Sequence, residues 1–239
     1  MNKLVTIAHL YPGEMNIYGD MGNIITLRKR LEWRGYEVVL RRLEAGKAFD
    51  WDKVDLVFGG GGQDSGQLIA GPDLIRHSDD LTGLSRAGVP MLVVCGLYQL
   101  FGRGFTTIEG QELPGIGIFR ADTVGSARRM TGNILIDTQF GRLVGFENHS
   151  GQTELDSDQA PLGRVLKGFG NNEGRRDEGA VSGNTIGTYL HGPILPKNPT
   201  LADYLILAAL KRRWNVTELA PLDNSLERKA FEVAVGRPE

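Results

Sequence analysis

Apolar runs that alternate with helical patterns restrict the N-terminal part of this chain to one kind of fold. Strand-like runs occupy 4–9, 37–40, 55–58 and 91–94, and helical spacing appears at Ile24, Leu27 and Leu31 and over 74–86. The runs 55–58 and 91–94 are continuously apolar, as in strands buried on both faces. Asp20 or Asn23 could cap the first helix. The alternation predicts an α/β fold with a mostly parallel central sheet flanked by helices.

Residues 105–190 differ in character from the part before them. Short segments rich in Ile, Val and Thr are separated by turns, which predicts an added region of antiparallel strands. The polar, Gly-rich stretch 171–183 is expected to be a surface loop, 185–190 a strand and 202–214 a helix. We expect one domain over 1–215 and a charged C-terminal tail over 216–239, whose pattern also fits a helix near 225–235.

Composition narrows the classes of function. With 27 Lys and Arg against 29 Asp and Glu, the net charge is −2, and no basic stripe marks a nucleic-acid-binding surface. The single cysteine excludes an intramolecular disulfide and a four-cysteine zinc site, and the four histidines show no ligand spacing, so no metal site is expected. No stretch approaches the ~18 apolar residues of a transmembrane helix, and the N-terminus does not fit a secretory signal. We therefore expect a cytoplasmic protein.

Cys95 stands where an apolar strand is expected to end, and Gly96 and a helix from Leu97 follow it. A lone cysteine is usually a small buried hydrophobe. This strand–turn–helix context, however, is typical of the sharp turn that carries the nucleophile in hydrolases. A thiol near a helix N-terminus is expected to have a lowered pKa. The N–H of Gly96 would point to where an oxyanion forms.

A run of four glycines, Gly59 to Gly62, follows the buried strand 55–58. Such a run can be no more than a flexible loop. Its position after a buried strand favours a role in binding, because ligands of parallel sheets lie beyond the carboxyl ends of the strands. Glycine also lets backbone N–H groups approach a ligand closely. We expect Gly60 or Gly61 to supply one oxyanion N–H and Gly96 the other.

Two of the four histidines are candidates for the base that deprotonates Cys95. Only His149 and His191 lie in strand-adjacent, Gly-flanked segments. Either could accept the thiol proton, and the residues alone leave both open.

The segment Cys95-Gly96-Leu97-Tyr98-Gln99 resembles the nucleophile turn of class I glutamine amidotransferases, in the branch that includes the cobyric acid synthase glutaminases. Gly187 to Gly192 is similar to the catalytic histidine segment of that branch, which favours His191 as the base. Residues 147–151 resemble a second segment lining the same site. The segments 16–23, 168–172 and 190–198 are similar to the amidotransferase subunits of lipid II isoglutaminyl synthases, and this resemblance covers about residues 4–215.

The resemblance implies a glutaminase that hydrolyses L-glutamine and passes ammonia to a separate MurT-like synthetase subunit of the Mur-ligase family. That partner uses ATP and Mg to amidate the α-carboxylate of D-glutamate in the stem peptide of lipid II. No cofactor is expected on this chain, which lacks the Gly-x-x-x-x-Gly-Lys-[Ser/Thr] phosphate loop. The alternatives are the glutaminase of a cobyric-acid-type synthase, which usually carries its own nucleotide-binding domain, and a non-catalytic amidotransferase-like scaffold.

The resemblance also assigns residues to the substrate. Arg129, in Arg129-Met130-Thr131-Gly132, aligns with an arginine that binds glutamine, and Gln99 is implied as a second substrate-binding residue. Many class I enzymes carry a glutamate two residues after the histidine, where this chain has Pro193. Asp20 and Glu147 are therefore the candidate carboxylates that could orient the imidazole of His191.

Overall fold

A computed structural model describes residues 3–17 and 19–237, so Tyr18 of the segment 16–23 lies outside the described residues. The central sheet has the strand order β11-β12-β4-β3-β1-β2. Its strands are β1 (Leu4–Leu10), β2 (Glu37–Leu43), β3 (Leu56–Gly59), β4 (Met91–Val94), β11 (Ala180–Ser182) and β12 (Thr185–Thr188). All neighbours pair in parallel except β11, which runs antiparallel to β12. The predicted α/β fold with a mostly parallel sheet is confirmed.

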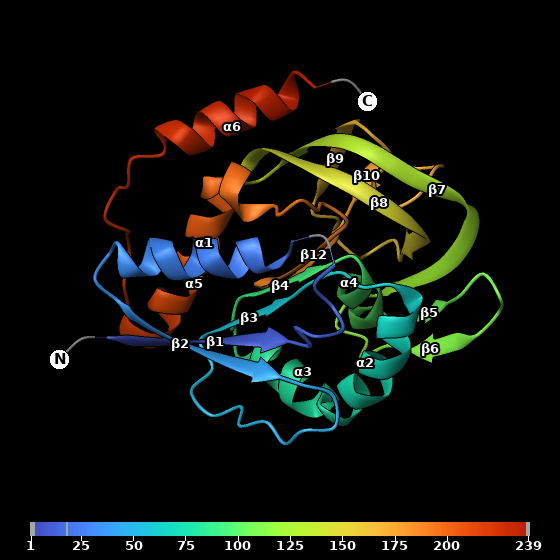
Figure 1. Cartoon of the computed structure of the whole chain (residues 1–239), viewed down its shortest axis with the longest axis horizontal. Helices are drawn as coiled ribbons and strands as arrows, with labels where there is room; N and C mark the ends of the chain where they lie inside the picture. Colours follow the sequence, from blue (N-terminus) through green and yellow to red (C-terminus); the bar gives the residue numbers. More distant parts are fainter. Residues whose placement is uncertain (1–2, 18, 238–239) are drawn as a thin grey trace.

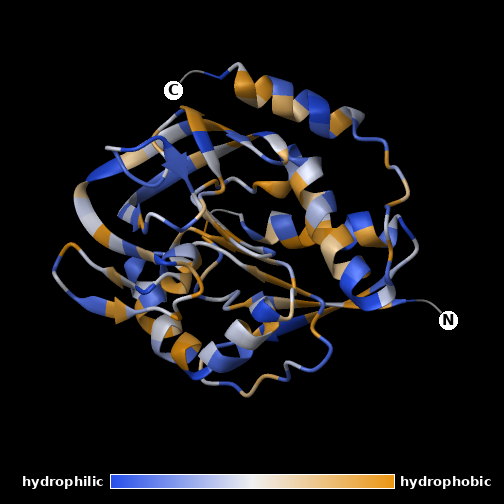
Figure 2. Ribbon diagram, turned by 180° about the vertical axis from the view of Figure 1, so that it is seen from behind, coloured by the Kyte–Doolittle hydropathy of each residue, from blue (hydrophilic) through white to orange (hydrophobic). Residues whose placement is uncertain are grey.

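Helices cover both faces of this sheet, as Figure 1 shows: α1 (Met21–Glu32) and α5 (Pro199–Trp214) lie on one side, and α2 (Asp64–Arg76) and α3 (Ser78–Arg86) on the other. Hydrophobic residues concentrate on the central strands in Figure 2. The side chains of β3 and β4 are fully buried, which explains their continuously apolar sequences. None of the helices among the described residues is both long and apolar enough to cross a bilayer.

A second, largely antiparallel sheet lies beside the first and has the order β10-β9-β7-β5-β6, with β8 paired to β7. Its strands are β5 (Gly104–Thr106), β6 (Glu112–Pro114), β7 (Ala121–Thr138), β8 (Gly141–Leu155), β9 (Gly163–Lys167) and β10 (Asp177–Glu178). The expected antiparallel region is therefore present. Its main feature is the long hairpin of β7 and β8.

The helix expected over 74–86 is wrong in its extent. The structure has two helices there, α2 and α3, and α2 begins ten residues earlier, at Asp64. Gly66 and Pro72 both lie inside α2. A β-carbon on Gly66 would lie 2.6 Å from the carbonyl oxygen of Glu14, so tertiary packing accounts for this glycine inside a helix.

The prediction of a surface loop over 171–183 is confirmed only for residues 173–176, which are exposed and lie in no strand. The rest of the stretch contains β10 and β11, and Asn171 and Asn172 are buried. The Asn171 side chain accepts hydrogen bonds from the Tyr98 hydroxyl (3.0 Å) and the Gly179 N–H (2.9 Å), and donates to the Gly179 carbonyl (3.0 Å). Polar residues can be buried when their hydrogen bonds are satisfied, which composition does not reveal.

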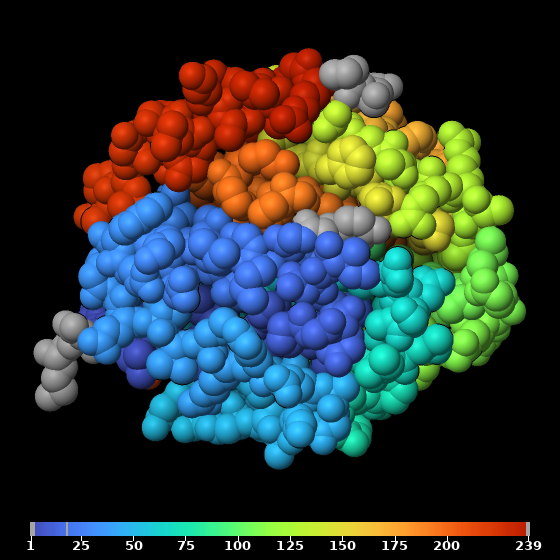
Figure 3. Space-filling model, in the orientation of Figure 1, coloured from blue at the N-terminus to red at the C-terminus, as the bar shows by residue number. Residues whose placement is uncertain are grey.

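The C-terminal tail runs along the outside of the molecule (Figure 3). Its helix α6 (Ser225–Val235) has no buried residue and packs against β8 and the short 3-10 helix η1 (Leu195–Lys197). Arg30 of α1 holds the tail, because its buried guanidinium donates to Asn224 (2.9 Å) as well as to Asp203 of α5 (2.7 and 2.9 Å). The helix expected near 225–235 is thus present, while the domain boundary at 215 stays a prediction.

Candidate active site

The strands β3, β4 and β12 end side by side at one edge of the central sheet. Their pairing register determines where the candidate site lies. Thr188 of β12 pairs with Val94 of β4, and Gly59 of β3 pairs with Val93. The residues that follow these ends, including Gly60 and Cys95, therefore emerge side by side. This edge is where open parallel sheets bind their ligands.

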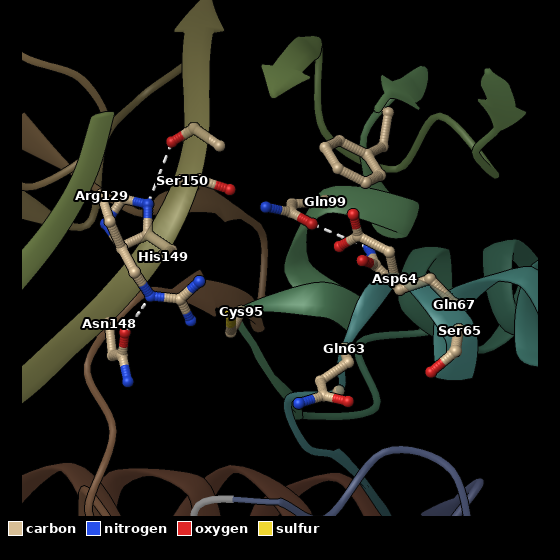
Figure 4. A pocket seen from close by; sticks show the side chains of 13 residues that line it. Gln63, Asp64, Ser65, Gln67, Cys95, Gln99, Arg129, Asn148, His149 and Ser150 are labelled. Atoms are coloured by element: carbon tan, nitrogen blue, oxygen red, sulfur yellow. Dashed lines mark hydrogen bonds between the residues drawn. The ribbon is translucent and has the colours of Figure 1, made fainter. Parts of the chain in front are cut away.

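Cys95 forms the predicted sharp turn between β4 and α4 (Gly96–Phe101). Its backbone has φ 50° and ψ −107°, a conformation that costs a non-glycine residue about 1–3 kcal/mol. Two hydrogen bonds fix the turn: the Cys95 N–H donates to the Thr188 carbonyl (2.8 Å), and the Gln99 N–H donates to the Cys95 carbonyl (3.0 Å). The turn directs the sulfur into a pocket (Figure 4).

The backbone of Gly61 lies against both Cys95 and His191. A β-carbon on Gly61 would lie 2.7 Å from Cε1 of His191 and 3.1 Å from Cβ of Cys95. His191 is itself held in place by a main-chain bridge to Phe146 of β8, with hydrogen bonds of 2.8 and 3.1 Å. The glycine run, the cysteine and the histidine singled out in the sequence thus meet at one point.

His149 is in the same neighbourhood but has a different environment. Its ring stacks on Tyr189, with centroids 3.6 Å apart and planes 4° apart. Its Nδ1 lies 2.9 Å from the carbonyl oxygen of Gly151, and this contact assigns the proton to Nδ1. His149 therefore forms part of the pocket wall, while His191 adjoins Cys95 across Gly61.

Burial disfavours the charged forms of both Cys95 and His191. Burial raises the pKa of the Cys95 thiol to about 12, and the charge of Asp20 adds to this, although the Gly96 N–H and Arg129 act in the opposite direction. Burial, followed by His149 and Arg129, lowers the pKa of His191 to about 3. The expected lowering of the thiol pKa is wrong, because desolvation outweighs the helix terminus. A neutral imidazole is nevertheless the form that can accept the thiol proton.

The N–H of Gly61 is already engaged in this structure. It donates to Oδ2 of Asp20 at 2.7 Å. Gly60 also faces Asp20, since a β-carbon on it would lie 2.6 Å from the same oxygen. The Gly60–Gly61 backbone thus separates the Asp20 carboxylate from Cys95 and His191. The oxyanion roles of Gly60, Gly61 and Gly96 stay predictions.

The two candidate carboxylates have different surroundings. Asp20 is fully buried, makes no cap hydrogen bond to α1, and has no hydrogen-bond partner for Oδ1 among the described residues. Burial raises its pKa to about 6. Glu147 is also fully buried, but its two oxygens accept the N–H groups of Phe169 (2.8 Å) and Gly170 (2.9 Å). Glu147 therefore fixes the turn at 168–170, while Asp20 supports the glycine run.

The pocket has a volume of about 370 Å³ and is built from both sheets. One side comes from residues 62–67 at the start of α2 together with Cys95 and Gln99, and the other from β7 and β8, as Figure 4 shows. The full lining is Gly62, Gln63, Asp64, Ser65, Gln67, Cys95, Gln99, Phe105, Arg129, Asn148, His149, Ser150 and Gly151.

A bulge in β7 brings Arg129 to this pocket. Gly125 pairs with Gly151 and Met130 with His149, so the four residues 126–129 oppose Ser150 alone. Such bulges redirect side chains next to functional sites. The Nε of Arg129 donates to Oδ1 of Asn148 (2.5 Å), whereas the neighbouring Arg128 pairs with Glu173 (3.0 Å). Arg129, and not Arg128, is the arginine that lines the pocket.

Gln99 lines the pocket as a member of a buried hydrogen-bond chain. Its Oε1 accepts from Gln67 (2.7 Å) and its Nε2 donates to the Tyr189 hydroxyl (3.1 Å), which lies 2.6 Å from Oγ1 of Thr153. Gln67 also donates to the Gly96 carbonyl (3.2 Å). Both ends of the Gln99 amide are therefore held within the protein, and its role in binding substrate stays a prediction.

Sequence reasoning missed Gln67, Tyr189 and one buried acid, Glu178. The Glu178 carboxylate accepts hydrogen bonds from the Tyr189 N–H (2.6 Å) and the Thr188 hydroxyl (3.0 Å), just before His191. Burial raises the pKa of Glu178 to about 8. No pattern in the sequence marks these residues, because their contacts arise only in the folded chain.

Known proteins resemble this chain in sequence and in fold. Residues 6–199 match the family described as the CobB/CobQ-like glutamine amidotransferase domain. The "Lipid II isoglutaminyl synthase (glutamine-hydrolyzing) subunit GatD" of Staphylococcus aureus is 39% identical over 234 residues, which cover 98% of this chain and 96% of that protein. The protein of the same name from Streptococcus pneumoniae is 38% identical over 213 residues, covering 88% and 82%.

Among solved structures, a crystal structure of a glutamine amidotransferase superposes with a TM-score of 0.58 at 13% identity, and the superposition covers 84% of this chain and 98% of that one. At this identity the likeness concerns the fold alone. The sequence match over most of the chain, with relatives of similar length, carries the assignment: the chain belongs to the CobB/CobQ-like glutamine amidotransferase family.

Proposed function

We propose that this chain hydrolyses L-glutamine as the glutaminase subunit of a lipid II isoglutaminyl synthase. The observation that carries the proposal is the juxtaposition of Cys95, held in a sharp turn, with the buried His191 across Gly61. A neutral thiol beside a neutral imidazole is an arrangement that can generate a nucleophile when substrate arrives. Membership of a glutamine amidotransferase family supports glutamine as the substrate.

The reaction follows from these positions. Glutamine binds with its α-carboxylate at Arg129 and its side-chain amide at Cys95. His191 takes the thiol proton as sulfur bonds to the amide carbon, and the oxyanion is held by backbone N–H groups, including that of Gly96. The protonated His191 then gives its proton to the departing nitrogen, and ammonia leaves. Water, deprotonated by His191, cleaves the thioester and releases glutamate.

Of the two candidate carboxylates, we assign the supporting role to Asp20. Both oxygens of Glu147 are used by the turn at 168–170, whereas one oxygen of Asp20 has no partner among the described residues and the other holds Gly61. Asp20 thereby positions the glycine against which His191 rests. For Gly61 to bind the oxyanion, its N–H must first leave Oδ2 of Asp20.

The ammonia acceptor is proposed from the relatives. The S. aureus and S. pneumoniae proteins are named as subunits of a glutamine-hydrolyzing lipid II isoglutaminyl synthase. By analogy, a MurT-like synthetase subunit binds ATP and Mg, activates the D-glutamate α-carboxylate of lipid II and receives ammonia from this chain. The sequence has no phosphate-binding loop of its own, in keeping with ATP chemistry on a partner. We place the reaction in the cytoplasm.

The test measures glutamate released from L-glutamine by the purified chain with and without the synthetase subunit. We expect turnover that rises with the partner and is lost in Cys95→Ala and His191→Asn. His77→Asn is the matched control, because His77 lies outside the pocket. Lipid II with ATP and Mg, compared with a cobyric acid precursor, identifies the acceptor. Turnover that persists in Cys95→Ala, or none with the intact complex, would refute the proposal and favour the scaffold alternative.

A further inference from the structure

The pocket contains one carboxylate and one guanidinium. Asp64 is the only acidic residue among the lining residues described above, and Arg129 is the only Lys or Arg among them. Figure 4 shows them on opposite sides of the pocket, with Cys95 between them. Both side chains are exposed at the pocket rim, so a ligand can reach them.

Asp64 is available for a ligand. It is the first residue of α2 and follows the glycine run directly after Gln63. Within 3–17 and 19–237, its carboxylate takes part in no hydrogen bond or ion pair. Arg129 comes from the other sheet, on the bulge of β7. The two charged side chains therefore come from different elements, α2 and β7, and both line the pocket.

Both charges act on the reactive sulfur. Asp64 contributes to raising the pKa of the Cys95 thiol, while Arg129 lowers it. Cys95 thus lies within electrostatic reach of each. A ligand whose reacting group is at Cys95 can place its other end between the two charged side chains.

We propose that Asp64 binds the α-ammonium of glutamine and, with Arg129, selects for a free amino acid. This inference rests on the proposed function. Free glutamine carries a carboxylate and an ammonium on one carbon and an amide at its far end. With the carboxylate at Arg129 and the amide at Cys95, the ammonium needs an acceptor, and Asp64 is the one anionic group in the lining. A glutaminyl residue inside a peptide has both α-groups in peptide bonds, so it carries neither charge and gains neither contact.

A purely structural role for Asp64 makes a different prediction. An acidic residue in the first turn of a helix stabilises the helix by about 0.3–1 kcal/mol through the helix dipole. Asp79 occupies the first turn of α3, outside the pocket, and provides the matched control. Asp64→Asn and Asp79→Asn should therefore have similar effects on the melting temperature, and only Asp64→Asn should affect substrate selection.

The experiment compares kcat/KM for L-glutamine with kcat/KM for 4-carbamoylbutanoate, which has the same carboxylate and amide but no ammonium. In the complex with the synthetase subunit, we expect Asp64→Asn to lower the value for L-glutamine about 10- to 100-fold, the range for loss of one hydrogen bond to a charged group. The value for 4-carbamoylbutanoate should stay within about threefold of wild type. If turnover of the analogue is too slow, inhibition by L-glutamate and by glutarate gives the same comparison.

Two outcomes would overturn the inference. One is an equal loss on both substrates, which indicates a positional effect on the site. The other is full activity of Asp64→Asn toward L-glutamine. A wild-type complex that does not hydrolyse L-glutamine would instead overturn the proposed function, and this inference with it, so the two failures are distinguishable.

Discussion

Replacement of Gly61 with alanine tests how the site is assembled. The added methyl group would lie 2.7 Å from Cε1 of His191 and 3.1 Å from Cβ of Cys95, closer than van der Waals contact allows. Gly61 has no positive φ, so the backbone itself accepts alanine without strain. The effect of the substitution therefore comes from the contact of the methyl group with Cys95 and His191, the proposed catalytic pair.

The magnitude follows from where the methyl group must go. His191 is buried and tied to β8 by two main-chain hydrogen bonds, so it can yield only by tilting its ring. Overpacking of this kind costs about 1–3 kcal/mol of stability. A displacement of about 1 Å between reacting groups lowers the rate by about 10²-fold. We expect Gly61→Ala to fold, to melt at a lower temperature and to lose about two orders of magnitude in kcat.

The assay is glutamate release at saturating L-glutamine, together with thermal unfolding of each variant. Gly13→Ala is the control, because a β-carbon on Gly13 meets nothing within 4 Å. It should match wild type in rate and in melting temperature. If Gly61→Ala keeps a kcat within about threefold of wild type, then contact between the methyl group and the catalytic pair does not limit the reaction, and the reasoning is refuted.

Three further predictions concern buried polar groups around the site and at the C-terminal tail. Glu178 binds a proton in the folded state between its ordinary pKa of 4.5 and about 8, so wild-type stability falls as pH rises through that window. Glu178→Gln should therefore gain about 2 kcal/mol relative to wild type between pH 6 and 8, because the full slope of about 1.36 kcal/mol per unit decreases as pH approaches the folded pKa. Equal pH slopes in urea unfolding would contradict this. Arg30→Ala removes the hydrogen bonds to Asp203 and Asn224, while Arg34 still pairs with Asp203, so it should cost about 1.5–3 kcal/mol and open the tail to limited proteolysis. An unchanged cleavage rate argues against the tether. Gln67→Leu and Gln99→Leu should be less than additive in urea unfolding, by about 0.5–3 kcal/mol, because they share one hydrogen bond.

The sequence was sufficient to predict the edge of the sheet that carries the site. The buried strands β3 and β4 are recognisable as apolar runs, and strands that run parallel must end at the same edge. Local sequence patterns were therefore enough to predict that the glycine run and Cys95 lie close together. The choice of His191 over His149 required the family resemblance, because their local sequences are alike.

Properties that depend on tertiary contacts could not be predicted. The raised pKa of Cys95 reflects burial, whose effect outweighs that of the local helix terminus. The position of Arg129 requires the bulge opposite Ser150, and no single strand shows its partner's register. Asn171 was placed in a loop from its polar neighbours, yet it is buried by contacts to Tyr98 and Gly179.

The division of the pocket between two sheets has a mechanical consequence. Cys95 and Asp64 are anchored to the parallel sheet, while Arg129 is carried by the long β7–β8 hairpin. A small molecule bound to Cys95 and to Arg129 connects the two layers. A movement of the hairpin therefore changes the affinity of the pocket for that molecule. By thermodynamic reciprocity, if an occupant of the pocket strengthens the binding of a partner to the hairpin, that partner strengthens the binding of the occupant by the same factor. A protein that docks on β7 or β8 would thus regulate the proposed glutaminase reaction without contacting Cys95.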